Sequence, residues 1–505
     1  MITRKLFFQR PLLFVLLLVA VWGLLYLPHL RTSPGWYGDE TLTLMIGRSL
    51  FAGEGADRAL QVTFWHPSYS YQPGYAWLVG LAASFAGGDI VGGRLLNVVM
   101  ALAIALVIFF GGSRPFGRKA ALFGALVFLT YGQTVIHFRW IYPHNVVALG
   151  FAVTVLCLLR KSSLRADWTA GAGLAVAAAC HPLFVHGALA AWLCRIKRPV
   201  AWVRMAVLPT LALAGCIGWT LARQSPHLWV FDDIRTLAGF YGKFSQENGS
   251  GLQVFRNIQF FYSHDLFHAG AAVAALICCH RRFYVIPVFL AVVSGLLLQN
   301  RQNLPVFYYQ AVVFLPVMAM AWAGAARTVE AGLRRRLGGR RWTRWLPAAA
   351  FALPGFLFLQ TVVPAISGTL VPRNQPWVTQ SVPEVETASA WLNERLSPGD
   401  LVICHQNIGW LLKCRTADLM QATAWSGRPT FTFEKRPESE RFRYPADLHA
   451  AKFLVLGDID RRWTLGQPNV FWIPEEMTRL RWPVVWQGEN YVIVANPDFL
   501  LGSSR

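Results

Sequence analysis

The chain has 505 residues, of which 54% are hydrophobic and 14% are charged, and its apolar residues form long runs separated by short basic segments. This composition excludes an ordinary soluble enzyme and indicates a polytopic α-helical membrane protein. The net charge is +21, but residues 384–505 hold 15 acidic and 14 basic side chains, so the excess of positive charge lies in the membrane part. This distribution indicates the topology of the membrane segments and gives no support to a nucleic-acid partner.

The first predicted element is an apolar run from Leu12 to Leu30, which is long enough to span a membrane. It follows Arg4, Lys5 and Arg10, and no small-residue cleavage pattern comes after it. These features predict an uncleaved signal anchor with a cytoplasmic amino terminus.

An acidic pair, Asp39-Glu40, follows this first span directly. Two neighbouring carboxylates at a membrane surface suit general-base chemistry, because one can accept a proton while the other orients it. The alternative is a solvated acidic loop.

Two short helices are predicted after the acidic pair. Leu42, Met45, Ile46 and Leu50 recur at helical spacing, which predicts an amphipathic helix lying in the membrane interface. Packing without a role in chemistry is the alternative for this helix. A loop rich in Tyr and Pro then opens a second surface helix over 73–87.

About eleven membrane crossings are predicted in all. After the first, the candidate spans are 91–111, 119–136, 144–160, 168–181, 183–194, 200–222, 267–280, 283–299, 305–326 and 345–365. All basic loops become cytoplasmic if 168–194 is a hairpin of two short helices with its tip at His181-Pro182 and if 73–87 lies along the outer surface instead of crossing. External segments then include 31–90, 223–266 and the C-terminal part, and no acidic residue falls inside a span, which argues against an ion-coupled transporter.

The C-terminal part changes character near Thr379. Glu384–Leu396 reads as a helix, and Asp400–Cys404, Lys452–Leu456 and Tyr491–Ala495 read as strands. We therefore predict two domains, a membrane domain over 1–372 and a small soluble external domain of α/β or α+β type over 373–505. Asp458-Ile459-Asp460 is interpreted as a turn, and a Cys404–Cys414 disulfide is left open.

The order of these parts resembles the GT-C glycosyltransferases, including the lipid A aminoarabinose transferases and the protein O-mannosyltransferases. The resemblance covers residues 10–330. The motifs that carry it are Gly38-Asp39-Glu40-Thr41, Gln72-Pro73-Gly74-Tyr75, an Arg94-led span, the Arg139–Asn145 loop, and Leu304-Pro305 with Tyr309 and Pro316.

The resemblance implies an inverting transferase that moves a monosaccharide from a polyprenyl-phosphate carrier to a glycolipid, envelope glycan or protein acceptor. Asp39 would then be the general base and Glu40 its orienting neighbour. The implied donor-binding residues are Arg139, Arg301, Tyr309, His66, Gln72, His144 and Asn145. It also implies a multi-pass protein of the bacterial cytoplasmic membrane, in contact with membrane lipids, whose C-terminal domain is periplasmic.

The sequence departs from the family at Gln72, where the aminoarabinose transferases have a lysine. The Arg139–Asn145 loop has no acidic residue, whereas the oligosaccharyltransferase relatives bind a metal with acids in that loop. We therefore predict transfer without a metal or other cofactor. A noncatalytic lipid or glycan transporter and an envelope-assembly scaffold are the alternatives, and the sugar and the acceptor stay open.

Overall fold

A computed structural model describes residues 11–52, 72–223, 251–279, 283–298, 312–336, 350–372, 378–430, 442, 444–467 and 469–501. The chain forms two compact units. The first consists of Met1–Leu30, Arg94–Ile217 and Lys243–Leu370, and the second of Arg31–Gly93, Gly218–Gly242 and Val371–Arg505. The segment with the acidic pair is thus grouped with the C-terminal segment. The predicted boundary at 372/373 separates a membrane domain from an external domain, and it stays a prediction.

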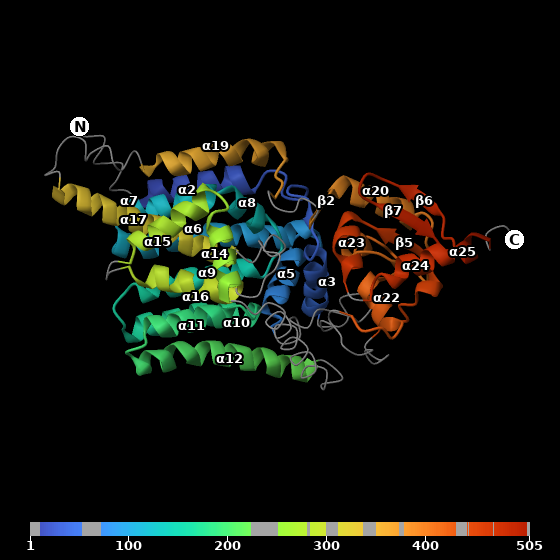
Figure 1. Ribbon diagram of the computed structural model, residues 1–505, viewed down its shortest axis with the longest axis horizontal. Helices are drawn as coiled ribbons and strands as arrows, with labels where there is room; N and C mark the ends of the chain where they lie inside the picture. Colours follow the sequence, from blue (N-terminus) through green and yellow to red (C-terminus); the bar gives the residue numbers. More distant parts are fainter. Residues whose placement is uncertain are drawn as a thin grey trace. The chain divides into compact units, whose positions relative to one another are not determined.

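The first unit is built of apolar helices, several of which run roughly parallel in Figure 1, as α9 to α12 do. The bounds are α2 (Pro11–Tyr26), α6 (Ile90–Phe116), α7 (Arg118–Thr130), α8 (Gly132–Arg139), α9 (His144–Leu158), α10 (Leu164–Cys180), α11 (Phe184–Cys194), α12 (Pro199–Arg223), α14 (Gly251–Tyr262), α15 (Leu266–Ile277), α16 (Val285–Leu298), α17 (Leu315–Arg336) and α19 (Ala352–Ser367).

Three helices among the described residues are long and apolar enough to cross a membrane: α6, α12 and the helical segment Val312–Arg336. The bent pair α7 and α8 adds a fourth if it counts as one span. The chain is a multi-pass membrane protein, and the total of about eleven crossings stays a prediction.

One predicted span differs in the structure. The sequence predicts a single helix over 119–136, but α7 ends at Thr130 and α8 begins at Gly132, with an angle of 62° between them. Tyr131 between them is extended, its ring stacks on Phe267 at 4.0 Å, and its hydroxyl donates to the Asp265 carboxylate. These contacts with a distant part of the chain hold Tyr131 out of the helix. The predicted pair of short helices around His181-Pro182 is confirmed as α10 and α11.

In the second unit, α3 (Glu40–Phe51) and α5 (Gly74–Ser84) confirm both helices predicted after the acidic pair. Their backbones meet at Gly47 and Gly80. A Cβ atom on Gly80 would lie 1.9 Å from the Gly47 carbonyl oxygen, so only glycine permits this approach. Apolar side chains of both helices pack around the crossing, among them Leu42, Ile46 and Ala76.

The C-terminal segment folds around a five-stranded mixed sheet with strand order β4-β3-β5-β7-β6. Strand β3 is parallel to β4 and β5, and β7 is antiparallel to β5 and β6. The bounds are α20 (Val382–Asn393), β3 (Leu401–Ile403), α21 (Gln406–Gly409), β4 (Arg415–Ala417), α22 (Leu419–Trp425), β5 (Ala451–Leu456), α23 (Asp458–Arg462), α24 (Trp472–Arg479), β6 (Val484–Gln487), β7 (Val492–Ala495) and α25 (Pro497–Leu501).

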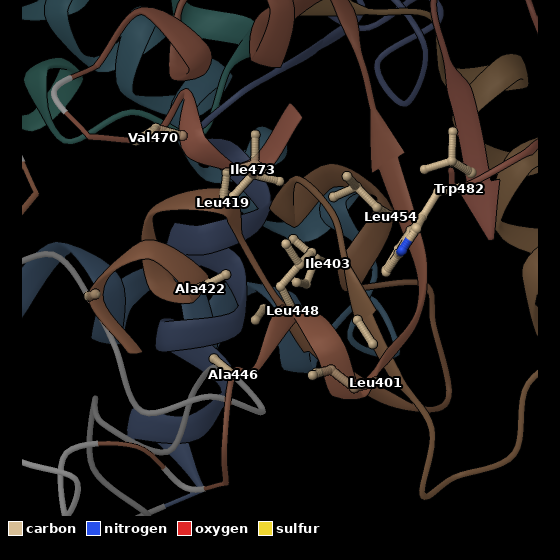
Figure 2. Close-up of a cluster of buried hydrophobic side chains, with 14 of the residues drawn as sticks. Leu401, Ile403, Leu419, Ala422, Ala446, Leu448, Leu454, Val470, Ile473 and Trp482 are labelled. Atoms are coloured by element: carbon tan, nitrogen blue, oxygen red, sulfur yellow. The ribbon is translucent and has the colours of Figure 1, made fainter. Parts of the chain in front are cut away.

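A buried apolar cluster forms the core between this sheet and its helices. Figure 2 shows Ile403 and Leu454 of the sheet, Leu419 of α22 and Ile473 of α24 among its members. The predicted helix near 384–396 and the three predicted strands are confirmed as α20, β3, β5 and β7. The interpretation of Asp458–Asp460 as a turn was wrong. These residues begin α23, and the Asp460 carboxylate accepts the N–H of Gly457, the residue before the helix, at 3.0 Å.

Candidate active site

The acidic pair lies in a turn that is fixed on its amino-terminal side by a short strand. Strand β1 (Trp36–Tyr37) pairs antiparallel with β2 (Thr379–Gln380) of the C-terminal segment. The Trp36 side chain is fully buried, and its ring meets that of Trp410 edge to face at 5.3 Å. Because the large Trp36 ring is fully buried, it holds the main chain in place where the turn begins. We call residues 36–41 the acidic turn.

Glu40 is a structural member of the acidic turn. Its side chain is fully buried, and one carboxylate oxygen accepts the Tyr37 N–H at 2.8 Å. Glu40 is also the first residue of α3, where a negative charge is favoured by the helix dipole. The carboxylate therefore closes the turn by bonding to a residue that precedes Asp39.

Asp39 has the opposite character. Its backbone carbonyl accepts bonds from the N–H and the hydroxyl of Thr43, but its carboxylate makes no capping bond to α3. The side chain is exposed, and one carboxylate oxygen accepts the Tyr37 hydroxyl at 3.3 Å. The carboxylate is thus left available to accept a proton from another molecule.

The surroundings of Asp39 suit that task. Although the residue is exposed on one side, protein around it desolvates the carboxylate, and this raises the pKa of Asp39 above its ordinary value, while the bond from Tyr37 lowers it. A carboxylate with a raised pKa is a stronger base than an ordinary aspartate.

The other predicted site residues are distributed between the two units. Gln72 lies in the second unit, two residues before the first residue of α5, and is buried. Arg139, His144 and Asn145 lie in the first unit, around the connection between α8 and α9. His66, Arg301 and Tyr309 lie outside the described residues.

All three residues of the first unit are buried. The Arg139 guanidinium donates to the Leu25 carbonyl at 2.6 Å. The His144 ring stacks on Tyr142 at 4.2 Å and lies 4.4 Å from the His181 ring, measured between ring centroids. Asn145 donates to Asn97 at 2.9 Å.

Sequence reasoning missed the C-terminal residues that contact the acidic turn. A Cβ atom on Gly38 would lie 2.8 Å from Ile459 Cδ1 and 3.5 Å from the His405 ring. The Asn407 side chain bonds to Trp36 and Thr41, which are 371 and 366 residues away in sequence. No spacing or motif signals such contacts.

Within the described parts of the chain, no three His, Cys, Asp or Glu side chains come together as a metal site. The prediction of metal-independent transfer remains a prediction. Cys404 and Cys414 are both buried with free thiols in the structure.

No protein-family model matches the chain, and no curated protein matches it. Several solved structures match it over most of its length, among them the following two. ArnT from Cupriavidus metallidurans, bound to undecaprenyl phosphate, has a TM-score of 0.59 and 15% identity, covering 96% of this chain and 97% of that one. The archaeal oligosaccharyltransferase AglB from Archaeoglobus fulgidus, in complex with an inhibitory peptide and a dolichol-phosphate, has a TM-score of 0.53 and 11% identity, covering 89% and 69%. The chain has the GT-C glycosyltransferase fold.

The fold match extends over both units, since 96% of the chain is covered by the match to ArnT. The structure places an exposed carboxylate at the start of α3, and it fixes the main chain around that carboxylate with contacts from the C-terminal segment. The motif order that suggested the GT-C resemblance is thus accompanied by a matching fold.

Proposed function

We propose that this chain is an inverting glycosyltransferase of the bacterial cytoplasmic membrane. It moves a monosaccharide from a polyprenyl-phosphate carrier to an acceptor on the outer face, and the acceptor is a glycolipid, an envelope glycan or a protein. The fold supports the proposal, because the structures that share it include one bound to undecaprenyl phosphate and one bound to dolichol-phosphate.

The observation that carries the proposal is the state of Asp39. Its carboxylate is exposed, has a raised pKa and is not used as a helix cap, while its neighbour Glu40 is buried in the turn. In our proposal, the acceptor hydroxyl oxygen attacks C1 of the sugar as Asp39 takes its proton. The bond between C1 and the phosphate oxygen breaks, and its electron pair leaves with the polyprenyl phosphate.

The donor-binding residues stay proposals. Phosphate charge is best met by arginine, whose guanidinium offers five N–H donors. Arg139 is fully buried and already donates to Leu25, so it would serve a phosphate only within the first unit. His144 and Asn145 are buried at the start of α9, and Gln72, His66, Arg301 and Tyr309 complete the proposed set.

Reconstituted proteoliposomes with a labelled polyprenyl-phosphate sugar test the proposal against the transporter alternative. Membrane extract supplies the acceptors. We expect the wild-type chain to release free polyprenyl phosphate and to transfer label to an acceptor. Movement of intact donor across the bilayer without cleavage would instead support a transporter. The absence of both transfer and donor movement would support the scaffold.

The Tyr37 hydroxyl bonds to the charged form of Asp39 and so lowers its pKa. We expect Tyr37→Phe to raise the pKa of Asp39 further, because the charged form loses a stabilising bond. The base is active when deprotonated, so the acid limb of kcat/KM should move to higher pH. A pH-rate profile of the purified variant checks this, and an unmoved or downward-shifted limb would contradict it.

Glu40 is expected to act through the bond that it accepts from Tyr37 N–H rather than through proton transfer. Glu40→Gln retains an accepting oxygen and should keep transfer within about fivefold of wild type. Glu40→Ala leaves the Tyr37 N–H without that acceptor, which costs about 1–3 kcal/mol of free energy. If the turn loses that free energy in the reactive conformation, the transfer rate falls about 5- to 150-fold. Initial transfer rates of the two variants test this prediction. Equal losses of rate in both variants would show that the Glu40 charge takes part in the reaction.

A further inference from the structure

The acidic turn lies at the edge of the C-terminal sheet where the parallel strands end. His405 follows β3, and Ile459 lies in α23 after β5. Both side chains approach Gly38, as the distances from its Cβ position show. In open α/β sheets, the carboxyl ends of the strands are where ligands bind. Here the chain's own acidic turn occupies that edge.

One side chain at this edge holds both ends of the turn. Asn407 is fully buried, and its Oδ1 accepts the Thr41 hydroxyl at 2.7 Å. Its Nδ2 donates to the Gln380 Oε1 at 2.9 Å and reaches the Trp36 carbonyl at 3.5 Å. Trp36 lies three residues before Asp39 and Thr41 lies two residues after it.

The backbone of Asn407 is itself fixed. The Asn407 N–H donates to His405 Nδ1 at 3.2 Å, and this bond orients the first turn of α21. Gln380 pairs with Trp36 in the β1–β2 ladder and also accepts the Tyr491 hydroxyl. Burial lowers the pKa of His405 to about 4, so at neutral pH the imidazole is neutral and Nδ1 can accept. The C-terminal segment therefore presents hydrogen-bonding groups to the acidic turn that are already fixed in position.

Among the described residues, the hydroxyl of Tyr37 donates the one side-chain hydrogen bond that the Asp39 carboxylate accepts, and this bond is within the turn. The direction of the carboxylate is consequently set by the main chain from Trp36 to Thr41. A displacement of about 1 Å at a reacting group can lower a rate about 100-fold. A residue that fixes this main chain from outside thus affects the base without touching it.

We propose that Asn407 is a positioning residue for Asp39, so that the C-terminal segment takes part in catalysis by holding the acidic turn. This inference rests on the proposed transferase function and adds a role for the C-terminal segment to it. Asn407 acts through Trp36 and Thr41 and makes no contact with the reacting atoms.

Purified full-length Asn407→Ala tests the inference. We expect kcat for polyprenyl phosphate release to fall about 10- to 100-fold with KM within about threefold of wild type. Backbone amides of residues 36–43 should exchange hydrogen faster than in wild type, while those of β3 and β5 should not. Thr41→Val removes only the hydroxyl bond to Asn407 and should give a smaller fall in kcat, and it carries the test if Asn407→Ala does not fold.

The matched control is Asn496→Ala. Asn496 is also a buried amide of the C-terminal segment, and it donates to the carbonyls of His449 and Ala451 at 3.0 and 3.1 Å. Its loss should lower thermal stability but leave kcat near wild type, because none of its bonds reaches the acidic turn.

The outcomes separate the two proposals. If wild type releases polyprenyl phosphate and Asp39→Asn does not, the transferase stands. A kcat for Asn407→Ala equal to that of wild type, or a loss matched by Asn496→Ala, then overturns the positioning role. If wild type cleaves no donor, the transferase fails and the positioning role fails with it.

Discussion

Asp39→Asn is expected to lower kcat for glycosyl transfer by about 100- to 10,000-fold, which is the contribution typical of a general base. Asparagine has nearly the same size and can still accept the Tyr37 hydroxyl through its amide oxygen, but it cannot take up the acceptor proton. Because the Asp39 side chain is exposed and makes no capping bond, its replacement should leave folding unchanged. Initial rates of polyprenyl phosphate release, with thermal unfolding of the same preparations, measure both effects.

The matched control for this variant is Glu394→Gln. Glu394 is an exposed acid of the C-terminal segment, 71% exposed at its side chain and paired only with the neighbouring Arg395 among its described contacts. It should retain full activity. An Asp39→Asn chain that transfers sugar at the wild-type rate would remove Asp39 as the base and leave the exposed carboxylate without an assigned role.

Gly80→Ala is expected to have the largest effect on stability. A Cβ at this position would lie 1.9 Å from the Gly47 carbonyl oxygen, which is backbone and has no rotamer to move away. Helices α3 and α5 would have to separate, and overpacking of this kind costs about 1–3 kcal/mol or more. Since α3 begins immediately after Asp39, we expect loss of transfer as well as a lower midpoint of thermal unfolding in detergent.

Gly355→Ala is the control for that substitution. Gly355 is also in a helix, α19, and apart from its own stretch of helix no heavy atom of the described residues lies within 4 Å of its Cβ position. Alanine there should be neutral or slightly stabilising, because glycine is the poorer helix former by about 0.5–1 kcal/mol. Equal unfolding midpoints for Gly80→Ala and wild type would show that the α3–α5 crossing tolerates a wider spacing than we describe.

Much of the local structure could be predicted from sequence because its signals are local. The spacing of Leu42, Ile46 and Leu50 predicts α3, and short runs of apolar residues predict β5 and β7. The break at Tyr131 could not be predicted in this way. Residues 119–136 are predominantly apolar, and contacts with Asp265 and Phe267, far along the chain, hold Tyr131 extended.

The candidate site was predictable only in part for the same reason. Asp39 and Glu40 stand out as an acidic pair beyond an apolar span, but their different roles depend on which one the fold buries. Strand β1 has two residues, too few to show alternation. Asn407 bonds to residues more than 360 positions away, and an isolated asparagine in the C-terminal segment has no distinguishing pattern.

The most direct test of the account is the pH dependence of kcat/KM for polyprenyl phosphate release, measured in parallel for wild type and Asp39→Asn. Wild type should lose activity with falling pH through an acid limb that lies above the ordinary aspartate pKa of 3.8, because desolvation raises the pKa of Asp39. The residual rate of Asp39→Asn should be flat across that range. The same acid limb in both proteins would show that another group is the base and would contradict the assignment of Asp39.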